Sequence, residues 1–114
     1  MIRASSLLGR IRRFWRGYDA FDQVVVVDDR DDVPARLGKH MYVVGSTKAK
    51  WVILECPCGC RQRIDVNLMS SRRPFWELRK SAELVSLYPS LWRGQGTCGS
   101  HFLVRESKII WCRD

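Results

Sequence analysis

Short apolar runs divide most of this 114-residue chain into segments of strand length. The β-branched run at residues 23–27 predicts a buried strand, and residues 41–44 and 51–56 predict two more. Both faces of the 51–56 segment are apolar, so we expect it to be covered on both sides. Residues 61–68 alternate, which predicts that Ile64, Val66 and Leu68 face inward and that Arg63, Asp65 and Asn67 face outward.

The second half of the chain repeats this pattern. Residues 75–80, 83–88, 101–105 and 108–113 read as four further strands. Residues 89–92 begin with a proline and are expected to leave the sheet, and residues 93–96 are expected to form a flexible turn. If the last hairpin pairs Arg105 with Lys108, residues 101 and 112 face each other, and so do residues 102 and 111.

The first residues have helical spacing instead. Between Ser5 and Gly17 the apolar residues share one face and the arginines take the other, with serine at the start and glycine at the end. Docking of this basic helix on its own domain or on a partner is favoured over membrane-surface or RNA binding. The predicted fold is therefore mostly β (α+β): an N-terminal amphipathic helix over residues 1–20, and a small antiparallel sheet over residues 21–114, stabilised by zinc.

Composition and charge limit the binding partners and the cellular compartment that we expect for this chain. The net charge of +8 suggests a nucleic acid or an anionic surface as a partner. However, acidic residues follow the basic N-terminal segment, so part of this charge is expected to be neutralised locally. The acidic cluster at residues 28–32 lacks the spacing of a calcium-binding loop, and we expect it to be a solvated loop. No run is long or apolar enough to span a bilayer, and arginines interrupt any secretory signal. A reducing cytoplasm is expected, which favours metal-bound thiols over disulfides.

The stretch Cys56-Pro57-Cys58-Gly59-Cys60 is the main chemical signal. Proline and glycine make it a turn, and three thiols point into one small volume at the tip of a predicted hairpin. Two more cysteines follow far downstream. Four thiolates are the ligand set of a closed structural zinc site. We therefore expect Zn²⁺ to be bound by four of the five cysteines, which are Cys56, Cys58, Cys60, Cys98 and Cys112.

Five short motifs together resemble a known bacterial family. They are the cysteine turn, Pro74-Phe75-Trp76, Pro89-Ser90-Leu91-Trp92, Cys98-Gly99-Ser100-His101-Phe102 and Trp111-Cys112. In this order they resemble the domain of unknown function 6527 family, over roughly residue 24 to the C-terminus. The resemblance implies a zinc-binding accessory protein of bacterial ubiquitin-like conjugation operons tied to phage defence. Its implied partners are a ubiquitin-like protein and the activating and conjugating enzymes, and its implied activity is that of a peptidase.

A peptidase of this kind needs a nucleophile and a base. The chain lacks the His-x-His pattern of metal-dependent deconjugating enzymes and a papain-like layout. Of its two histidines, His40 is expected to face solvent, which leaves His101 as the base. Ser100 points away from its neighbour in a strand, so Ser90 is the expected nucleophile. The orienting acid stays open among Glu55, Asp65 and Glu83.

Other readings stay open. His101 can instead be a zinc ligand, with activated water in an open metal position, although abundant thiols favour a closed site. The chain can also be a non-enzymatic adaptor whose sheet edge docks a ubiquitin-like tail. A nucleic-acid module is possible, but the tryptophans are expected in the core. That module would use Arg61, Arg63, Arg72, Arg73, Arg79, Lys80 and Arg93, with Trp51, Trp76 and Trp92.

Overall fold

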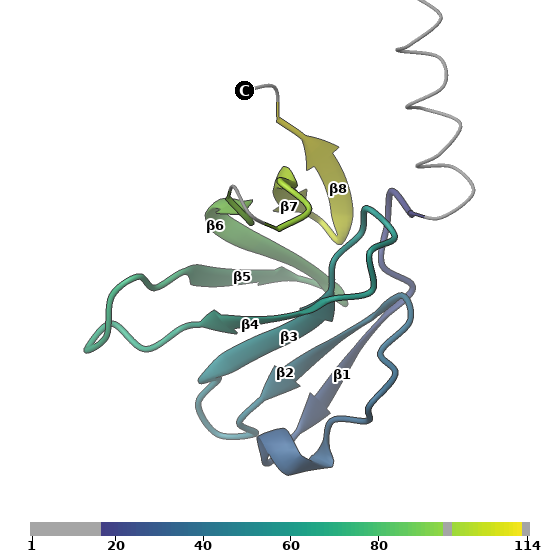
Figure 1. Cartoon of the computed structure of the whole chain (residues 1–114). Helices are drawn as coiled ribbons and strands as arrows, with labels where there is room; N and C mark the ends of the chain where they lie inside the picture. The colour runs from purple at the N-terminus through teal and green to yellow at the C-terminus, as the bar shows by residue number, and fades with distance from the viewer. Residues whose placement is uncertain (1–16, 95–96, 113–114) are drawn as a thin grey trace, which may run out of the picture.

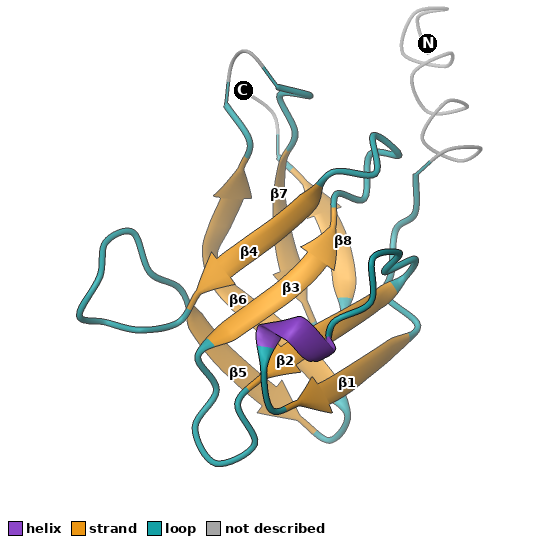
Figure 2. Cartoon of the chain, turned by 60° about the horizontal axis from the view of Figure 1, so that its bottom comes forward, coloured by secondary structure: helices purple, strands orange, loops and turns teal. Residues whose placement is uncertain are grey.

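Two four-stranded β-sheets pack against each other in the computed structural model, which describes residues 17–94 and 97–112 (Figure 1, Figure 2). The first sheet has the order β1-β2-β3-β4 and the second the order β5-β6-β7-β8. The strands of the first sheet are β1 (Gln23–Val27), β2 (His40–Val44), β3 (Trp51–Glu55) and β4 (Arg63–Asn67). Those of the second are β5 (Glu77–Ser81), β6 (Leu84–Trp92), β7 (His101–Arg105) and β8 (Lys108–Trp111).

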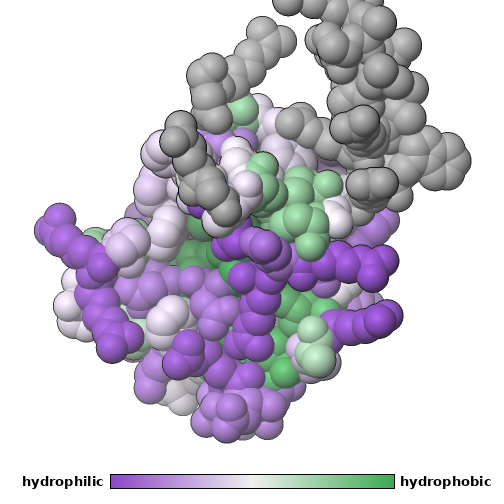
Figure 3. Space-filling model, viewed as in Figure 1, coloured by the Kyte–Doolittle hydropathy of each residue, from purple (hydrophilic) through white to green (hydrophobic). Residues whose placement is uncertain are grey.

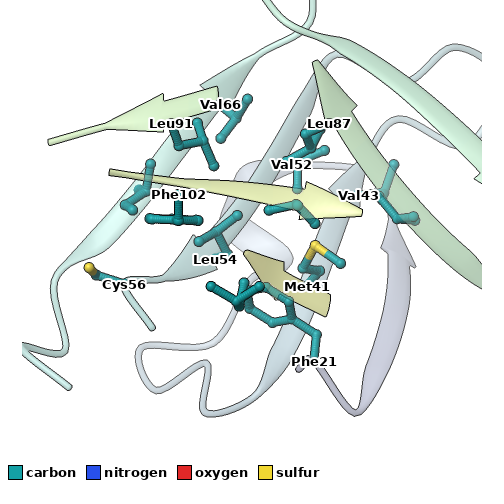
Figure 4. Close-up of a cluster of buried hydrophobic side chains, with 14 residues drawn as sticks. Phe21, Met41, Val43, Val52, Leu54, Cys56, Val66, Leu87, Leu91 and Phe102 are labelled. Carbon is teal, nitrogen blue, oxygen red and sulfur yellow. The ribbon is translucent and has the colours of Figure 1, made fainter. Parts of the chain in front are cut away.

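The main core lies between the two sheets. Inward-facing residues of β2, β3 and β4 meet those of β6, β7 and β8, and Cys56 closes one end of the cluster (Figure 4). A smaller cluster covers the other face of the first sheet, where Ile53 of β3 packs with Val33, Leu37, Tyr42 and Val44. β3 is therefore buried on both faces, as its continuous apolar run predicts.

The predicted single antiparallel sheet is wrong in two respects. There are two sheets, and β1 pairs with β2 in parallel, with Val25 opposite Tyr42. A parallel pair needs a long crossover, and residues 28–39 provide it. The crossover contains one 3-10 turn, η1 (Arg30–Asp32), whose N-cap Asp29 accepts a hydrogen bond from the backbone N–H of Asp31. Periodicity does not encode strand direction, which is why the sequence alone missed this pairing.

The prediction that residues 89–92 leave the sheet is also wrong, because β6 continues to Trp92. Leu87 pairs with Val104 and Leu91 pairs with Phe102, so two extra residues of β6 form a β-bulge between these pairs. A bulge tolerates Pro89, which has no backbone N–H for the ladder. The bulge carries the predicted nucleophile Ser90.

The closing hairpin has the predicted register. Arg105 pairs with Lys108 and Phe102 with Trp111, and the Cys112 N–H donates to the His101 carbonyl at 2.8 Å. Residues 18–22 join the sheets at one side, where the Phe21 N–H donates to the Ser107 carbonyl and the Asp22 N–H donates to the Lys39 carbonyl, both at 2.8 Å.

The helix predicted over residues 1–20 lies outside the described residues, except for residues 17–20, which are not helical. Within the described residues, no helix is long and apolar enough to cross a membrane. Hydrophilic side chains cover much of the face in Figure 3, with apolar groups showing between them. Asn67 and His40 depart from the predicted solvent-facing positions. Asn67 is buried and His40 is half-buried in β2.

Candidate metal and serine–histidine site

The cysteine turn is the tip of the β3–β4 hairpin, as predicted. Leu54 pairs with Ile64 and Glu55 with Arg63, and the Cys56 N–H donates to the Gln62 carbonyl at 2.8 Å across the tip. Gly59 has φ of 97°, a conformation that glycine adopts without steric cost. The hairpin thereby gathers the side chains of three cysteines at one end of the first sheet.

Cys98 reaches this tip from the connection between β6 and β7 of the second sheet. Its Sγ lies 3.6 Å from Cys56 Sγ, and Cys58 Sγ lies 3.4 Å from Cys56 Sγ. The sulfurs of Cys56, Cys58, Cys60 and Cys98 all lie within 4.8 Å of one another. A tetrahedral zinc–thiolate centre with Zn–S bonds of about 2.3 Å has sulfurs about 3.8 Å apart. The four cysteines therefore fit a metal ion such as zinc.

Hydrogen bonding around the sulfurs also suits thiolates. Each of three thiolates accepts a hydrogen bond from a backbone N–H: Cys56 from Cys58, Cys60 from Gln62, and Cys98 from Ser100. Burial is the stronger effect at Cys56 and Cys60, and it raises the pKa of both thiols. At Cys98 burial also disfavours the thiolate, but hydrogen bonds from the Ser100 hydroxyl and N–H outweigh it and lower the pKa of Cys98 to about 6. A bound cation would supply the remaining stabilisation of the buried sulfurs.

Cys112 is the cysteine left over. It is half-buried and does not belong to the group of four close sulfurs, although its backbone bonds to His101. His101 is not among these close donors either, within the described residues. The end of the chain therefore brings Cys98, His101 and Cys112 to one region, as the hairpin register predicts, but only Cys98 joins the cluster.

Ser90 and His101 form a direct side-chain contact, with Ser90 Oγ 2.8 Å from His101 Nε2. The two residues lie on neighbouring strands, because Trp92 of β6 pairs with His101 of β7. Ser90 is two positions before Trp92 and shares its face of the sheet, opposite the core residues Leu91 and Phe102. Both members of the pair are half-buried, so the contact is partly open to solvent.

Ser100 points elsewhere, as strand alternation predicts. Its hydroxyl lies 3.3 Å from Cys98 Sγ and its side chain is buried. Two sequence neighbours therefore serve different groups, with Ser100 beside the sulfur cluster and His101 beside Ser90. The Cys98–His101 segment connects the candidate metal centre to the Ser90–His101 pair through only two intervening residues.

Sequence reasoning missed the residue that fixes the Ser90 backbone. The Trp76 indole N–H donates to the Ser90 carbonyl at 3.2 Å. Trp76 is placed in turn by Asn67, whose carbonyl accepts from the Trp76 N–H at 2.8 Å. The Asn67 amide N–H group donates to the carbonyls of Met69, Arg72 and Pro74, at 3.1–3.2 Å. An asparagine at the end of a strand, followed by a loop that contains Pro74, is only a weak sequence signal that the asparagine amide bonds to several carbonyls of that loop.

The remaining predicted groups are distributed around this centre. Trp92 is 65% exposed, which contradicts its expected core role, and its ring lies 6.1 Å from the His101 ring. Among the acids considered as an orienting group, Asp65 is paired with Arg30 and Arg63, Glu55 lies in β3 opposite Arg63, and Glu83 lies at the β5–β6 turn.

Fold and site together define a class of protein: a two-sheet β domain with four cysteines placed close enough to hold a metal ion and an adjacent serine–histidine pair. Residues 27–112 match the family model described as bacterial ubiquitination-like system serine protease, BubE. The chain belongs to this BubE family. The resemblance to the domain of unknown function 6527 family is not tested by this match. The expected role in a bacterial ubiquitin-like system agrees with the description of the BubE family. No curated protein and no solved structure matches the chain.

Proposed function

We propose that the chain is a serine peptidase that hydrolyses the bond at the C-terminal tail of a ubiquitin-like protein. Such a cleavage either trims the tail or releases a conjugated target. The observation that carries the proposal is the 2.8 Å contact between Ser90 Oγ and His101 Nε2 in a member of a serine protease family. The ubiquitination-like setting of the family supports the substrate class, and the resemblance supports a role in phage defence beside activating and conjugating enzymes.

Ser90 is the proposed nucleophile and His101 the proposed base. With its proton on Nδ1, His101 accepts the Ser90 hydroxyl proton at Nε2 while Oγ attacks the carbonyl carbon of the scissile bond. Collapse of the tetrahedral intermediate breaks the C–N bond, and the leaving amine takes the proton from Nε2. Water then attacks the acyl ester, gives its proton to His101 and releases the carboxyl product, and Ser90 regains its proton.

The β-bulge and the Trp76 contact support this assignment. Bulges re-aim side chains next to active sites, and this bulge contains Ser90, whose side chain contacts His101 although Trp92 is the ladder partner of His101. The indole of Trp76 holds the Ser90 carbonyl from the other side. The nucleophile is therefore constrained through both its side chain and its backbone.

The proposed metal site has a structural role in this scheme. Bound zinc would cross-link the β3–β4 tip to the segment that leads into β7. That tip is further tied to the β6–β7 connection by Arg93, whose Nη2 donates to Gln62 Oε1 and whose N–H donates to the Ser100 carbonyl at 2.7 Å. These links hold the start of β7, and hence His101, in place.

The alternatives lead to different experimental outcomes. Two of the arginines that a nucleic-acid module would use for phosphates already form ion pairs within the chain: Arg63 pairs with Asp65 and Arg79 pairs with Glu77. A nucleic-acid module would show binding that weakens steeply with salt. An adaptor would bind the ubiquitin-like protein tightly without cleaving it.

The deciding experiment is in-gel cleavage of a tail-extended ubiquitin-like protein by the zinc-loaded protein. Wild type is expected to cleave, whereas Ser90→Ala and His101→Ala are each expected to lose more than about 10³-fold in rate. Zinc content measured by atomic emission is expected to stay unchanged in both variants. Ser86→Ala is a matched control, because Ser86 lies on the same strand away from His101. Full activity of Ser90→Ala would disprove the proposed role of Ser90.

A further inference from the structure

An open depression adjoins Ser90 on the outer face of the second sheet. It has a volume of about 680 Å³ and is lined by Phe75, Glu77, Tyr88, Pro89, Ser90, Leu103 and Arg105. Volumes of about 300–1,000 Å³ are typical of sites that take small ligands or side chains. The proposed nucleophile is thus part of the wall of a recess large enough for a substrate side chain.

The chemistry of this wall is mainly apolar. Phe75 is 40% exposed, and Leu103 and Tyr88 are half-buried, so their apolar surfaces remain partly in contact with water. Leu103 is two positions after His101 on β7, and Tyr88 is two positions before Ser90 on β6. The apolar surface therefore begins directly beside the serine–histidine pair. Covering this surface with an apolar group removes it from water, which favours binding.

Arginine side chains contact the Tyr88 part of this wall. The Tyr88 ring lies between two guanidinium groups, with the Arg105 Cζ 3.8 Å and the Arg79 Cζ 4.4 Å from the ring centroid. Arg105 Nη1 donates to the carbonyls of Leu87 and Val104, and Arg79 Nε pairs with Glu77 Oε1 at 2.9 Å. The Arg105 contacts join the Tyr88 ring on β6 to the neighbouring strand β7, so one side of the depression is built from both strands that carry the serine–histidine pair.

We infer that this depression is the specificity subsite of the proposed peptidase, and that it binds a bulky apolar side chain of the substrate next to the scissile bond. The inference rests on the proposed function, because it assigns the substrate preference of the same centre. The occupant is an extended polypeptide whose residue beside the cleaved bond is aliphatic or aromatic. Differences of one or more methylene groups in such a pocket typically change kcat/KM by about 10- to 200-fold.

The test begins with the bond that wild-type protein cleaves in a tail-extended ubiquitin-like substrate, mapped by mass spectrometry. The residues flanking that bond are then each replaced by leucine, phenylalanine, alanine or glycine, and kcat/KM is measured. We expect at least a 10-fold preference for leucine or phenylalanine over glycine at one flanking position. Leu103→Trp fills the depression and is expected to reduce this preference to less than 2-fold, and Phe75→Ala, which removes part of the wall, is expected to weaken it.

Leu84→Trp is the control, because it makes the same substitution at a leucine of the second sheet that lies at the β5–β6 turn, away from the depression. It is expected to keep the wild-type preference. An unchanged preference in Leu103→Trp, with circular dichroism and zinc content like wild type, would overturn the subsite. So would equal rates for all flanking residues in wild type.

A fluorophosphonate probe separates this inference from the proposed function, because it labels an activated serine without needing the subsite. Labelling of Ser90 together with cleavage, but without the expected preference, would overturn the subsite alone. Absence of both labelling and cleavage would overturn the peptidase and its subsite together. Labelling that is equal in wild type and Leu103→Trp, combined with the lost preference, would support the subsite.

Discussion

Cys56 Sγ and Cys98 Sγ lie 3.6 Å apart, although one cysteine follows β3 in the first sheet and the other precedes β7 in the second. This contact joins the two sheets at the end where Ser90 meets His101. Cys56 is fully buried at the edge of the shared core (Figure 4). Cys98, in contrast, is exposed. A metal at this point would connect the rigid interior to the segment that carries the proposed base.

The first prediction concerns which thiols bind metal. Cys98→Ser is expected to reduce bound zinc and to lower the free energy of unfolding by several kcal/mol, about 3 or more, because a structural metal contributes its binding energy to folding. Cys112→Ser is the control, since Cys112 lies outside the four-sulfur group. Zinc content and urea denaturation measure both variants. Equal zinc loss in Cys112→Ser would show that the cluster is assigned incorrectly.

The second prediction concerns the nucleophile and base as a unit. Because Ser90 and His101 act in one proton transfer, Ser90→Ala combined with His101→Ala is expected to be no slower than the worse single variant, within about 3-fold. Single-turnover cleavage of the tail-extended substrate measures the three variants. A multiplicative loss in the double variant would mean that the two residues act independently.

A third prediction follows from the indole contact to the Ser90 carbonyl. Trp76→Phe keeps an aromatic ring but removes the N–H donor, so kcat is expected to fall about 2- to 10-fold, the equivalent of one hydrogen bond. KM, zinc content and the unfolding midpoint are expected to change little, which distinguishes loss of positioning from loss of packing. Trp92→Phe is the comparison, because Trp92 is exposed and beside the same histidine. An equal drop in kcat for both variants would contradict a specific role for the Trp76 indole.

The fourth prediction concerns Asn67, whose amide supports the loop that ends at Trp76. Asn67→Ala removes three donated hydrogen bonds and the bond that Asn67 Oδ1 accepts from the Met69 N–H. We expect a loss of about 1–3 kcal/mol in unfolding free energy, because the buried Asn67 amide is removed and the loop carbonyls, which are part-buried, lose their partner. Asp65→Ala, on the same strand but more exposed, is expected to cost less than about 1 kcal/mol. Thermal and urea denaturation measure both.

The sequence predicts much of this architecture because strands and tight turns are determined largely by the residues within each short segment. Apolar periodicity predicts all eight strands of the described residues, and proline and glycine between the cysteines predict the turn at the hairpin tip. The register of the last hairpin followed from its two-residue turn. The contact of Ser90 with His101 was anticipated from chemistry, but its geometry depends on a bulge that local patterns do not reveal.

Other features depend on long-range packing that a single sequence does not encode. The parallel β1–β2 pair and the division into two sheets arise from a crossover that buries Val33 and Leu37. Alternation predicts that Asn67 faces outward, yet its side chain is buried and bonds to the following loop. The apolar neighbours of Trp92 predict a core position, but its place opposite His101 puts it on the outer face.

The last prediction uses the lowered pKa of Cys98. In the metal-stripped protein, alkylation of Cys98 by iodoacetamide is expected to rise with pH, to pass half of its maximum near pH 6, and to level off above pH 7 as the thiolate fraction approaches one. Because burial raises the pKa of Cys56, that thiol is expected to stay largely unmodified at pH 7. Peptide mass spectrometry after timed alkylation measures each site, with circular dichroism to verify that the stripped protein keeps its β structure. Zinc-loaded protein is expected to be protected at both positions, because bound metal occupies the sulfur lone pairs. A half-maximum for Cys98 above pH 8 would show that the hydrogen bonds from Ser100, Cys56 and Cys58 do not stabilise this thiolate.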